Sequence, residues 1–516
     1  MIYYRNECGW LNYEFEDVMK LFFLRPEMKK AGDSADECGQ AFIYCGRHEF
    51  NGQDCVVIRL RDGAYDEETG IPLEVDLLDG NGQDSGAGIF TGSGSQPEHK
   101  QEIKAFKRIF KRKLFLLLQE YTGKTIPWGI MTGIRPAKLV NEFLDRNRSR
   151  DDIISTLEQN YFVTADKAGL LYKVALNQRH LFAGSVPGGV SFYIGIPFCP
   201  TRCLYCSFSS STVGQYKKMV DAYIEALLEE IGQTASLIKK KGLRIESLYM
   251  GGGTPTSING RQLSHLLEGI ESHLELEDLK EYTLEAGRPD TIDREKLKII
   301  KNSRVSRISI NPQTMNSSTL ERIGRNHTPA EAEEAYWLAR ELGFDNINMD
   351  LICGLPGEDP AMFRTTLEKI SQLGPDSLTI HTMAVKRASR LTAEMGNYNL
   401  ETEFRQVADM VDMAGIQAGA MGLEPYYLYR QKDILGNLEN VGYSRKGKEC
   451  VYNIQIMEEK QSVIACGAGA VTKVVFPQDR IERAFNVKSV EEYIGRLDEM
   501  IGRKARLFEL LQQSYL

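Results

Sequence analysis

The chain has 516 residues, a net charge of −8, 42% hydrophobic residues and 26% charged residues. This length predicts two or three domains of ordinary globular composition, and the acidic balance argues against a nucleic acid or an anionic membrane as partner. The N-terminus has no signal-peptide pattern, and no stretch of about 18 apolar residues occurs. We therefore expect a cytoplasmic protein with no membrane span.

Residues 1–185 are predicted to form an N-terminal α+β domain. Short alternating runs such as 54–60 predict strands, and the spacing over 102–121 predicts a helix with one basic face. Residues 80–95, GNGQDSGAGIFTGSGS, predict a mobile loop or linker. A phosphate-binding loop is disfavoured because no Lys-Ser or Lys-Thr follows these glycines.

From residue 186 to 420, strand-like runs alternate with helical patterns six times. The predicted strands lie at 191–198, 245–250, 281–286, 307–313, 346–353 and 377–385. Such a series predicts a parallel sheet with right-handed crossovers. Six units are too few for an eight-fold barrel, so we expect an open or partial barrel with its site at the C-terminal ends of the strands. Residues 421–516 are predicted to form a C-terminal helical region that covers the site.

Three cysteines follow the first of these strands in the sequence CPTRCLYC, residues 199–206. Zinc usually needs four protein ligands and no second pair appears, while a redox CxxC motif would leave Cys199 unused. Three thiolates would suit a [4Fe-4S] cluster with one iron left open. The other seven cysteines are predicted to be small buried hydrophobes: Cys8, Cys38, Cys45, Cys55, Cys353, Cys450 and Cys466.

A second motif, GGGTPT at 251–256, follows the second strand. A tight turn alone would explain three glycines. Because the motif should lie at the same edge of the sheet as the cysteines, a ligand-binding turn with exposed backbone groups is the favoured interpretation.

These two motifs resemble those of the radical S-adenosylmethionine (SAM) enzymes. The finer patterns Y-x-G-I-P-F-C-x3-C-x-Y-C and NINMDLICGLPGE resemble the oxygen-independent coproporphyrinogen III oxidase branch, and most of all its HemZ-type dehydrogenases. The resemblance runs from about residue 127 to 475. It implies a partial (β/α)6 radical SAM barrel with an N-terminal α+β domain and a C-terminal extension.

The resemblance also implies roles for individual residues. Cys199, Cys203 and Cys206 would hold the [4Fe-4S] cluster, whose open iron binds SAM. The positions that would contact SAM are Tyr193, Tyr205, Gly252, Gly253, Thr254, Glu285, Gln313, Arg325, Asp350 and Ala384. A carboxylate suits ribose hydroxyls, and an arginine suits a carboxylate. From the residues alone, Glu285 and Asp350 could equally be ordinary polar residues at strand ends, and Arg325 a surface residue.

The implied activity is radical oxidative decarboxylation of two propionates of coproporphyrinogen III, which gives protoporphyrinogen IX in heme biosynthesis. An electron donor such as flavodoxin or ferredoxin would be the protein partner. Lys386, Arg387 and Arg390 follow the sixth strand and would meet the propionates, or else form a solvated helix start. The aromatic stretch 424–443 would cover the macrocycle or form a packing belt.

Two positions depart from the family pattern. Phe208 stands where the well-known oxidases have a fourth cysteine, and Gly195 stands where some relatives have histidine. The heme-chaperone branch also lacks the fourth cysteine. A heme chaperone on the same fold, and a radical SAM enzyme with another substrate, therefore stay open as alternatives.

Overall fold

The chain gathers into two compact units in the computed structural model. Unit 1 contains residues 1–133 and 148–169, and unit 2 contains residues 134–147 and 170–516. The expected bounds were 185 and 420. No boundary falls at 420, because the segment after residue 420 supplies strands to the same sheet as the segment before it. The structure describes residues 2–23, 27–31, 41–63, 65–78, 84–89, 97–206, 211–383, 400–431, 438–477 and 480–513.

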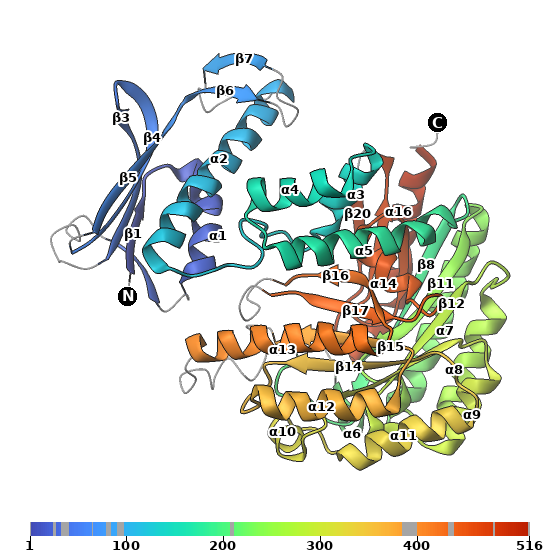
Figure 1. Cartoon of the computed structure of the whole chain (residues 1–516). Coiled ribbons are helices and arrows are strands. Elements are labelled where there is room, and N and C mark those ends of the chain that lie inside the picture. Colours follow the sequence, from blue (N-terminus) through green and yellow to red (C-terminus); the bar gives the residue numbers. More distant parts are fainter. Residues whose placement is uncertain are drawn as a thin grey trace. The chain divides into compact units, whose positions relative to one another are not determined.

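Unit 1 is an α+β unit around a five-stranded sheet in the order β2-β1-β3-β4-β5 (Figure 1). Its core combines aliphatic side chains of the sheet with apolar side chains of α1 and α2, among them Phe15, Phe22 and Phe110. The elements are β1 (Ile2–Asn6), η1 (Gly9–Leu11), α1 (Asn12–Phe22), β2 (Met28–Lys30), β3 (Phe42–Phe50), β4 (Gln53–Asp62), β5 (Tyr65–Pro72), α2 (Pro97–Thr122) and α4 (Arg150–Tyr161).

Part of the Gly/Ser-rich segment forms a strand, which corrects the prediction of a loop throughout 80–95. β7 (Asp84–Ile89) pairs antiparallel with β6 (Glu74–Leu78). Strand pairing uses backbone groups alone, so a high glycine content does not prevent it. The rest of the predicted loop lies outside the described residues.

Unit 2 is built on an eleven-stranded sheet in the order β16-β17-β15-β14-β13-β12-β11-β8-β18-β19-β20. The central run from β15 to β8 is parallel and contains all six predicted strands: β8 (Gly189–Ile196), β11 (Arg244–Gly252), β12 (Glu281–Gly287), β13 (Arg307–Gln313), β14 (Ile347–Cys353) and β15 (Ser377–Thr382). Because β16 and β20 are different edges of the described sheet, the barrel is open, as predicted.

The C-terminal segment widens this sheet on both sides. β18 (Ser462–Cys466) adds a seventh parallel strand beside β8, and β17 (Asn440–Ser444) pairs antiparallel with β15. The outer strands are β16 (Glu424–Tyr429), β19 (Val471–Val475) and β20 (Ile481–Phe485). The expectation of a helical covering region for residues 421–516 is thus wrong in part, because this segment contributes five strands to the sheet as well as helices.

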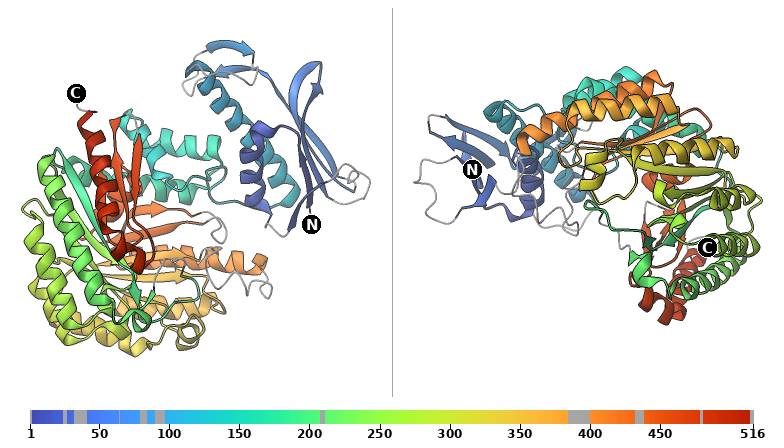
Figure 2. Two further views of the ribbon diagram at one scale, coloured as in Figure 1. Left: turned by 180° about the vertical axis from the view of Figure 1, so that it is seen from behind. Right: turned by 90° about the horizontal axis from the view of Figure 1, so that it is seen from below.

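Helices cover the outer face of the parallel strands (Figures 1 and 2). Several begin at side-chain caps, with capping boxes at Asn259 and Thr328. They are α7 (Val220–Lys240), α8 (Gly260–His273), α9 (Arg294–Asn302), α11 (Pro329–Glu341), α12 (Pro360–Leu373) and α13 (Leu400–Ala420). The other helices are α3 (Ala137–Asp145), α5 (Ala165–Ala183), α6 (Val213–Tyr216), α10 (Ser317–Arg322), α14 (Val451–Glu458), α15 (Val490–Gly495) and α16 (Leu497–Gln513).

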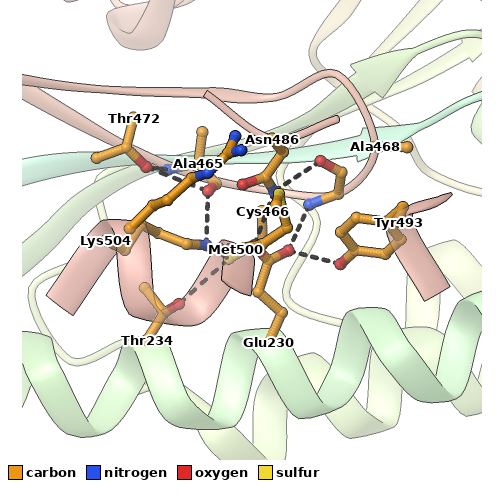
Figure 3. Close-up of polar contacts among 12 residues, drawn as sticks. Glu230, Thr234, Ala465, Cys466, Ala468, Thr472, Asn486, Tyr493, Met500 and Lys504 are labelled. Atoms are coloured by element: carbon orange, nitrogen blue, oxygen red, sulfur yellow. Dashed lines mark hydrogen bonds and ion pairs between the residues drawn. The ribbon is translucent and has the colours of Figure 1, made fainter. Parts of the chain in front are cut away.

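A buried ion pair joins α7 to α16 (Figure 3). Lys504 Nζ lies 2.6 Å from Glu230 Oε1, and the two side chains are 1% and 0% exposed. The same amine lies 3.2 Å from Cys466 Sγ, at the end of β18. Burial raises the pKa of the Cys466 thiol to about 12, so the sulfur is neutral near pH 7.

Six of the seven isolated cysteines are buried, as predicted, and Cys38 lies outside the described residues. All the cysteines that the structure describes are free thiols. Within the same residues, no helix combines the length and apolarity that crossing a bilayer requires.

Candidate active site

The inner face of the barrel is polar, because the parallel strands alternate between apolar side chains outside and polar side chains inside. Neighbouring strands exchange side-chain hydrogen bonds on this face: Ser247 Oγ to Ser191 Oγ at 2.8 Å, and Asn348 Nδ2 to Ser309 Oγ at 2.8 Å. Nearer the C-terminal ends the inner face carries Tyr193, Tyr249, Glu285, Asp350 and His381, all partly exposed.

The three predicted cluster ligands lie on one loop at this C-terminal edge. Cys199 ends the short strand β9 (Phe198–Cys199), which pairs with β10 (Ser211–Thr212). Cys203 is buried, whereas Cys199 and Cys206 are partly exposed. In the part of the chain that the structure describes, no three Cys, His, Asp or Glu side chains already converge as a metal site. The three thiols come from a single short loop.

An apolar cluster supports the cysteine loop. The backbone N–H of Leu204 donates to the carbonyl of Ile323 at 3.0 Å. The side chains of Leu204, Ile323, Ile352 and Leu355 pack together, with Tyr205 against them. This packing holds one side of the loop away from water.

The glycine turn after β11 lies directly against the cysteine loop. Gly253 N donates to Ile196 O and Thr254 N donates to Phe198 O, each at 2.7 Å. A Cβ at Gly253 would lie 2.5 Å from the Phe198 carbonyl oxygen, so only glycine fits. Gly252 has a φ of 105°, which also favours glycine. Thr254 Oγ1 lies 3.6 Å from Cys199 Sγ, so the turn and the loop form one structure.

Glu285 and Asp350 have pKa values displaced in opposite directions. Burial raises the pKa of Glu285 to about 7, although a hydrogen bond from Tyr249 opposes the shift. Burial also works against the charge on Asp350, but His381, whose Nε2 lies 3.7 Å from Asp350 Oδ2, and a hydrogen bond from Asn348 bring the pKa of Asp350 below the ordinary value. The site therefore holds one ionised carboxylate and one that changes protonation near neutral pH.

Gln313 and Arg325 bring unmatched polar groups to the edge near β13. Gln313 is a non-glycine residue with a φ of 68°, and its buried Oε1 has no hydrogen-bond partner among the described residues. The Arg325 guanidinium donates to Asn311 O and lies beside Tyr205 and Cys203, while its Nε has no partner in the same residues. Such groups are available to a ligand.

The donor set fits the implied cofactors. Three thiols on one loop can ligate three irons, and arginine beside Cys203 offsets the negative charge of a thiolate-ligated cluster. The unpartnered Gln313 Oε1 and Arg325 Nε, together with the bare backbone of Gly252, suit the polar groups of SAM.

Aromatic side chains form one wall of the site, and two of them, Tyr249 and Tyr452, were not predicted from the sequence. Tyr193, Tyr249 and Tyr452 stack, with ring centroids 4.6 Å apart for Tyr249 and Tyr452 and 6.0 Å apart for Tyr193 and Tyr452. Tyr429 of β16 lies 3.1 Å from His381 Nδ1. The aromatic stretch 424–443 therefore supplies sheet strands with side chains at the site.

The structure brings most of the predicted cofactor residues together at this edge: Tyr193, Tyr205, Gly252, Gly253, Thr254, Glu285, Gln313, Arg325 and Asp350. Ala384, Lys386, Arg387, Arg390 and Phe208 lie outside the described residues. Sequence reasoning missed Tyr249, His381 and Arg288. A period-two pattern of polar residues in successive strands was the available signal for Tyr249 and His381.

Comparison with known proteins agrees with the fold and the motifs. Residues 193–370 match the model of the radical SAM superfamily. The chain is 39% identical over 439 residues to the oxygen-independent coproporphyrinogen-III oxidase-like protein HemZ of Bacillus subtilis, covering 82% of this chain and 87% of that protein. It is 30% identical to the heme chaperone HemW of the same organism, over 60% of this chain and 76% of the chaperone.

Among solved structures, the coproporphyrinogen III oxidase HemN of Escherichia coli, described as a radical SAM enzyme, superposes with a TM-score of 0.50 at 23% identity. The superposition covers 63% of this chain and 73% of HemN, and supports the same fold. Proteins of this superfamily use a [4Fe-4S] cluster and SAM, and these are the cofactors of this chain. The extent of the match to the HemZ-type protein shows that the chain belongs to the radical SAM superfamily, in the HemN/HemZ family of oxygen-independent coproporphyrinogen III oxidase-like proteins.

Proposed function

We propose that this protein is an oxygen-independent coproporphyrinogen III dehydrogenase, a cytoplasmic enzyme of heme biosynthesis. It would convert two propionate side chains to vinyl groups and form protoporphyrinogen IX. The observation that carries the proposal is the 39% identity with the HemZ-type protein over 82% of the chain. That share is larger than unit 2 alone, so the likeness includes part of unit 1.

In this proposal Cys199, Cys203 and Cys206 hold the [4Fe-4S] cluster. When bound and reduced by a flavodoxin or ferredoxin, the cluster and SAM supply radical chemistry that removes hydrogen from an unreactive carbon. The protein positions the reactants and excludes water. The apolar cluster around Leu204 and Leu355 serves the second task, because it packs under the cysteine loop.

SAM would bind at the C-terminal edge of the parallel strands, where the polar side chains described above lie. Gly252, Gly253 and Thr254 present backbone groups to the methionine portion, and Glu285 accepts hydrogen bonds from the ribose. The Tyr249 hydroxyl donates to Glu285 and so fixes the direction of that carboxylate. Further SAM contacts are proposed for Tyr193, Tyr205, Gln313, Arg325, Asp350 and Ala384.

The substrate would lie over the barrel opening. Its four carboxylates need cations, and Lys386, Arg387 and Arg390 are the proposed partners after β15. The stacked tyrosines and His381 form a polar–aromatic wall against which a tetrapyrrole can pack. Changing Arg387 and Arg390 to Ala should weaken binding of the porphyrinogen more than binding of SAM; an equal loss of both would contradict this role.

The test is an anaerobic assay of the reconstituted protein with reductant, SAM and coproporphyrinogen III. Mass spectrometry would follow 5′-deoxyadenosine and the tetrapyrrole. We expect loss of two carboxyl groups from the substrate, and no turnover by a Cys203→Ser control. If the wild-type protein cleaves SAM but leaves the porphyrinogen unchanged, the dehydrogenase proposal is wrong.

A heme chaperone is the second candidate. It is favoured by the 30% identity to HemW and by Phe208, which replaces the fourth cysteine of the well-known oxidases. The HemW match covers 60% of this chain against 82% for the HemZ-type protein, which is why we rank it second. Stoichiometric heme binding with no change in porphyrinogen mass would select the chaperone.

A further inference from the structure

Arg288 is buried between the cysteine loop and a carboxylate, at a place that the proposed cofactor roles do not use. Its side chain is 3% exposed. The Nε and Nη2 groups donate to the two oxygens of Asp290 at 2.9 and 2.8 Å. The third nitrogen, Nη1, points to the loop: it donates to Thr201 Oγ1 at 2.6 Å and lies 3.9 Å from Cys203 Sγ.

The backbone around Arg288 is firmly held. Arg288 follows β12 directly, where Gly287 has a φ of 64°, and its N–H donates to Ala286 O at 2.8 Å. The Arg288 carbonyl accepts from Thr291 Oγ1 at 2.8 Å. Thr291 Oγ1 lies 2.7 Å from Thr256 Oγ1 in the glycine turn. One hydrogen-bonded unit thus joins the end of β12, the glycine turn and the cysteine loop.

The charge of Arg288 acts at the most enclosed of the three cysteines. Cys203 is 8% exposed, whereas Cys199 and Cys206 are partly exposed. Arg325 lies beside Cys203 as well. Burial and the two nearby guanidinium groups lower the pKa of His327 to about 4, so His327 adds no charge there. Arg288 and Arg325 therefore both bring positive charge close to Cys203.

Hydrogen bonds and positive charge at a cluster sulfur stabilise the reduced cluster, which carries one more negative charge than the oxidised one. Asp290 offsets part of the Arg288 charge, but it lies on the side of the guanidinium away from Nη1. In the ion pair of Arg288 and Asp290, the arginine Nη1 is therefore the charged group that faces Cys203. A fixed ion pair also holds the loop in one geometry, as outer partners of metal ligands generally do.

We propose that Arg288, held by Asp290, positions the cysteine loop for cluster binding and raises the reduction potential of the bound cluster through Cys203. The inference rests on the proposed role of Cys199, Cys203 and Cys206 and adds a positioning residue to that site. It is independent of which substrate the enzyme uses.

The test compares Arg288→Gln, Arg288→Lys and Asp290→Asn with the wild-type chain after anaerobic reconstitution, without any tetrapyrrole. Iron and sulfide per chain measure loading, and a redox titration followed by electron paramagnetic resonance measures the potential. Arg294→Gln is the matched control. Arg294, in α9, also pairs with a carboxylate, that of Glu341 in α11, but both side chains are exposed.

For Arg288→Gln we expect lower loading and an equilibrium constant for one-electron reduction about tenfold smaller, a downward shift of about 59 mV. Arg288→Lys should keep a potential near that of the wild type while loading falls, because lysine retains the charge but not the forked geometry. Asp290→Asn should lower loading and leave the potential equal to or above the wild-type value.

Separate outcomes overturn separate statements. If the wild-type chain binds a cluster and Arg288→Gln leaves both potential and loading unchanged, the inference about Arg288 is wrong. If Arg288→Lys lowers the potential as much as Arg288→Gln, the charge effect is absent and the proposal fails in that part. If the wild-type chain and Cys203→Ser bind equal amounts of iron, the cysteine assignment fails first and the inference falls with it.

Discussion

The ion pair of Lys504 and Glu230 makes a stringent test of the fold, because neither charge can reach water (Figure 3). Besides Lys504, the Glu230 carboxylate accepts hydrogen bonds from Asn486 Nδ2 at 2.7 Å, Gly467 N at 2.7 Å and the Tyr493 hydroxyl at 2.5 Å. Burial works against the charged amine, but Cys466 and Glu230 raise the pKa of Lys504. Changing Lys504 to Met would leave a buried carboxylate without its counter-charge.

Removing one partner of a buried pair costs about 3–5 kcal/mol, because the other charge stays uncompensated. The cost for Lys504→Met should lie toward the lower end of this range, because three hydrogen-bond donors to the Glu230 carboxylate remain. For a unit of about 360 residues with an unfolding entropy of about 2.1 cal/mol/K per residue, about 3 kcal/mol lowers the melting temperature by about 4 °C. Tyr493→Phe removes a hydrogen bond only and should cost about 1–2 kcal/mol.

The assay is thermal and urea unfolding of the cluster-free chain, followed by circular dichroism. Lys239→Met is the control on the same helix: its pair with Glu275 is exposed, and we expect no measurable change. The double variant Glu230→Gln with Lys504→Met should recover much of the loss, since no charge is left buried. If Lys504→Met alone is as stable as the wild type, or no less stable than the double variant, the reasoning about this pair is refuted.

Three further predictions concern the site. Because the pKa of Glu285 rises from 4.5 to about 7 on folding, the folded chain binds an extra proton between these values, and its stability falls as pH rises through that window. Glu285→Gln cannot ionise, so its urea stability relative to the wild type should increase by about 2–3 kcal/mol from pH 5 to pH 8; a constant difference would contradict the shift. Tyr249→Phe removes a hydrogen bond that lowers the pKa of Glu285. In that variant the pKa of Glu285 should rise further, so the pH range over which stability falls should extend to higher pH. Gly253→Ala should reduce iron uptake on reconstitution, because its Cβ would meet the Phe198 carbonyl, whereas Gly214→Ala, with open space around it, should load like the wild type.

The β–α units were predictable because local and long-range signals coincide in them. The run at 191–198 is apolar, as a buried strand requires. The helix that follows it in the chain has an amphipathic pattern, so its apolar side can pack on the strands. The cysteine and glycine motifs were recognisable because each occupies a single short segment after a strand. Their shared location follows from the parallel order, since consecutive strands end at the same edge.

The contacts of Arg288 and His381 could not be predicted from local patterns. Arg288 looks like an ordinary loop residue, and its meaning arises only when the end of β12 meets the cysteine loop 87 residues earlier in the chain. His381 continues the alternation of Ser377 and Thr379, but Tyr429 reaches it only because β17 pairs antiparallel with β15 and β16 pairs antiparallel with β17. Pairings at such sequence distances leave no periodic signal.

The pairing of β18 with β8 also could not be predicted from local sequence patterns. It determines the packing of the GAGA segment at 467–470, which follows β18 in the chain. A parallel strand beside β8 places this segment next to Gly195, where a Cβ at Gly467 would lie 2.4 Å from the Gly195 carbonyl oxygen. The Tyr223 hydroxyl bridges the two segments, donating to Gly195 O at 2.6 Å and accepting from Ala468 N at 3.0 Å. The glycines thus serve close packing of two strand ends.

The polar interior of the barrel is divided into a closed layer and an open one, and this division explains where ligands can bind. In the closed layer, Arg307 is 1% exposed and donates to Ser377 Oγ at 2.9 Å. Glu281 accepts from Val451 N at the start of α14, where the helix dipole favours a carboxylate. Protein groups already occupy that end. Tyr193, Tyr249, Glu285, Asp350 and His381 stay partly exposed nearer the C-terminal ends of the strands, so the polar groups that remain available to a ligand lie on the side that carries the cysteine loop.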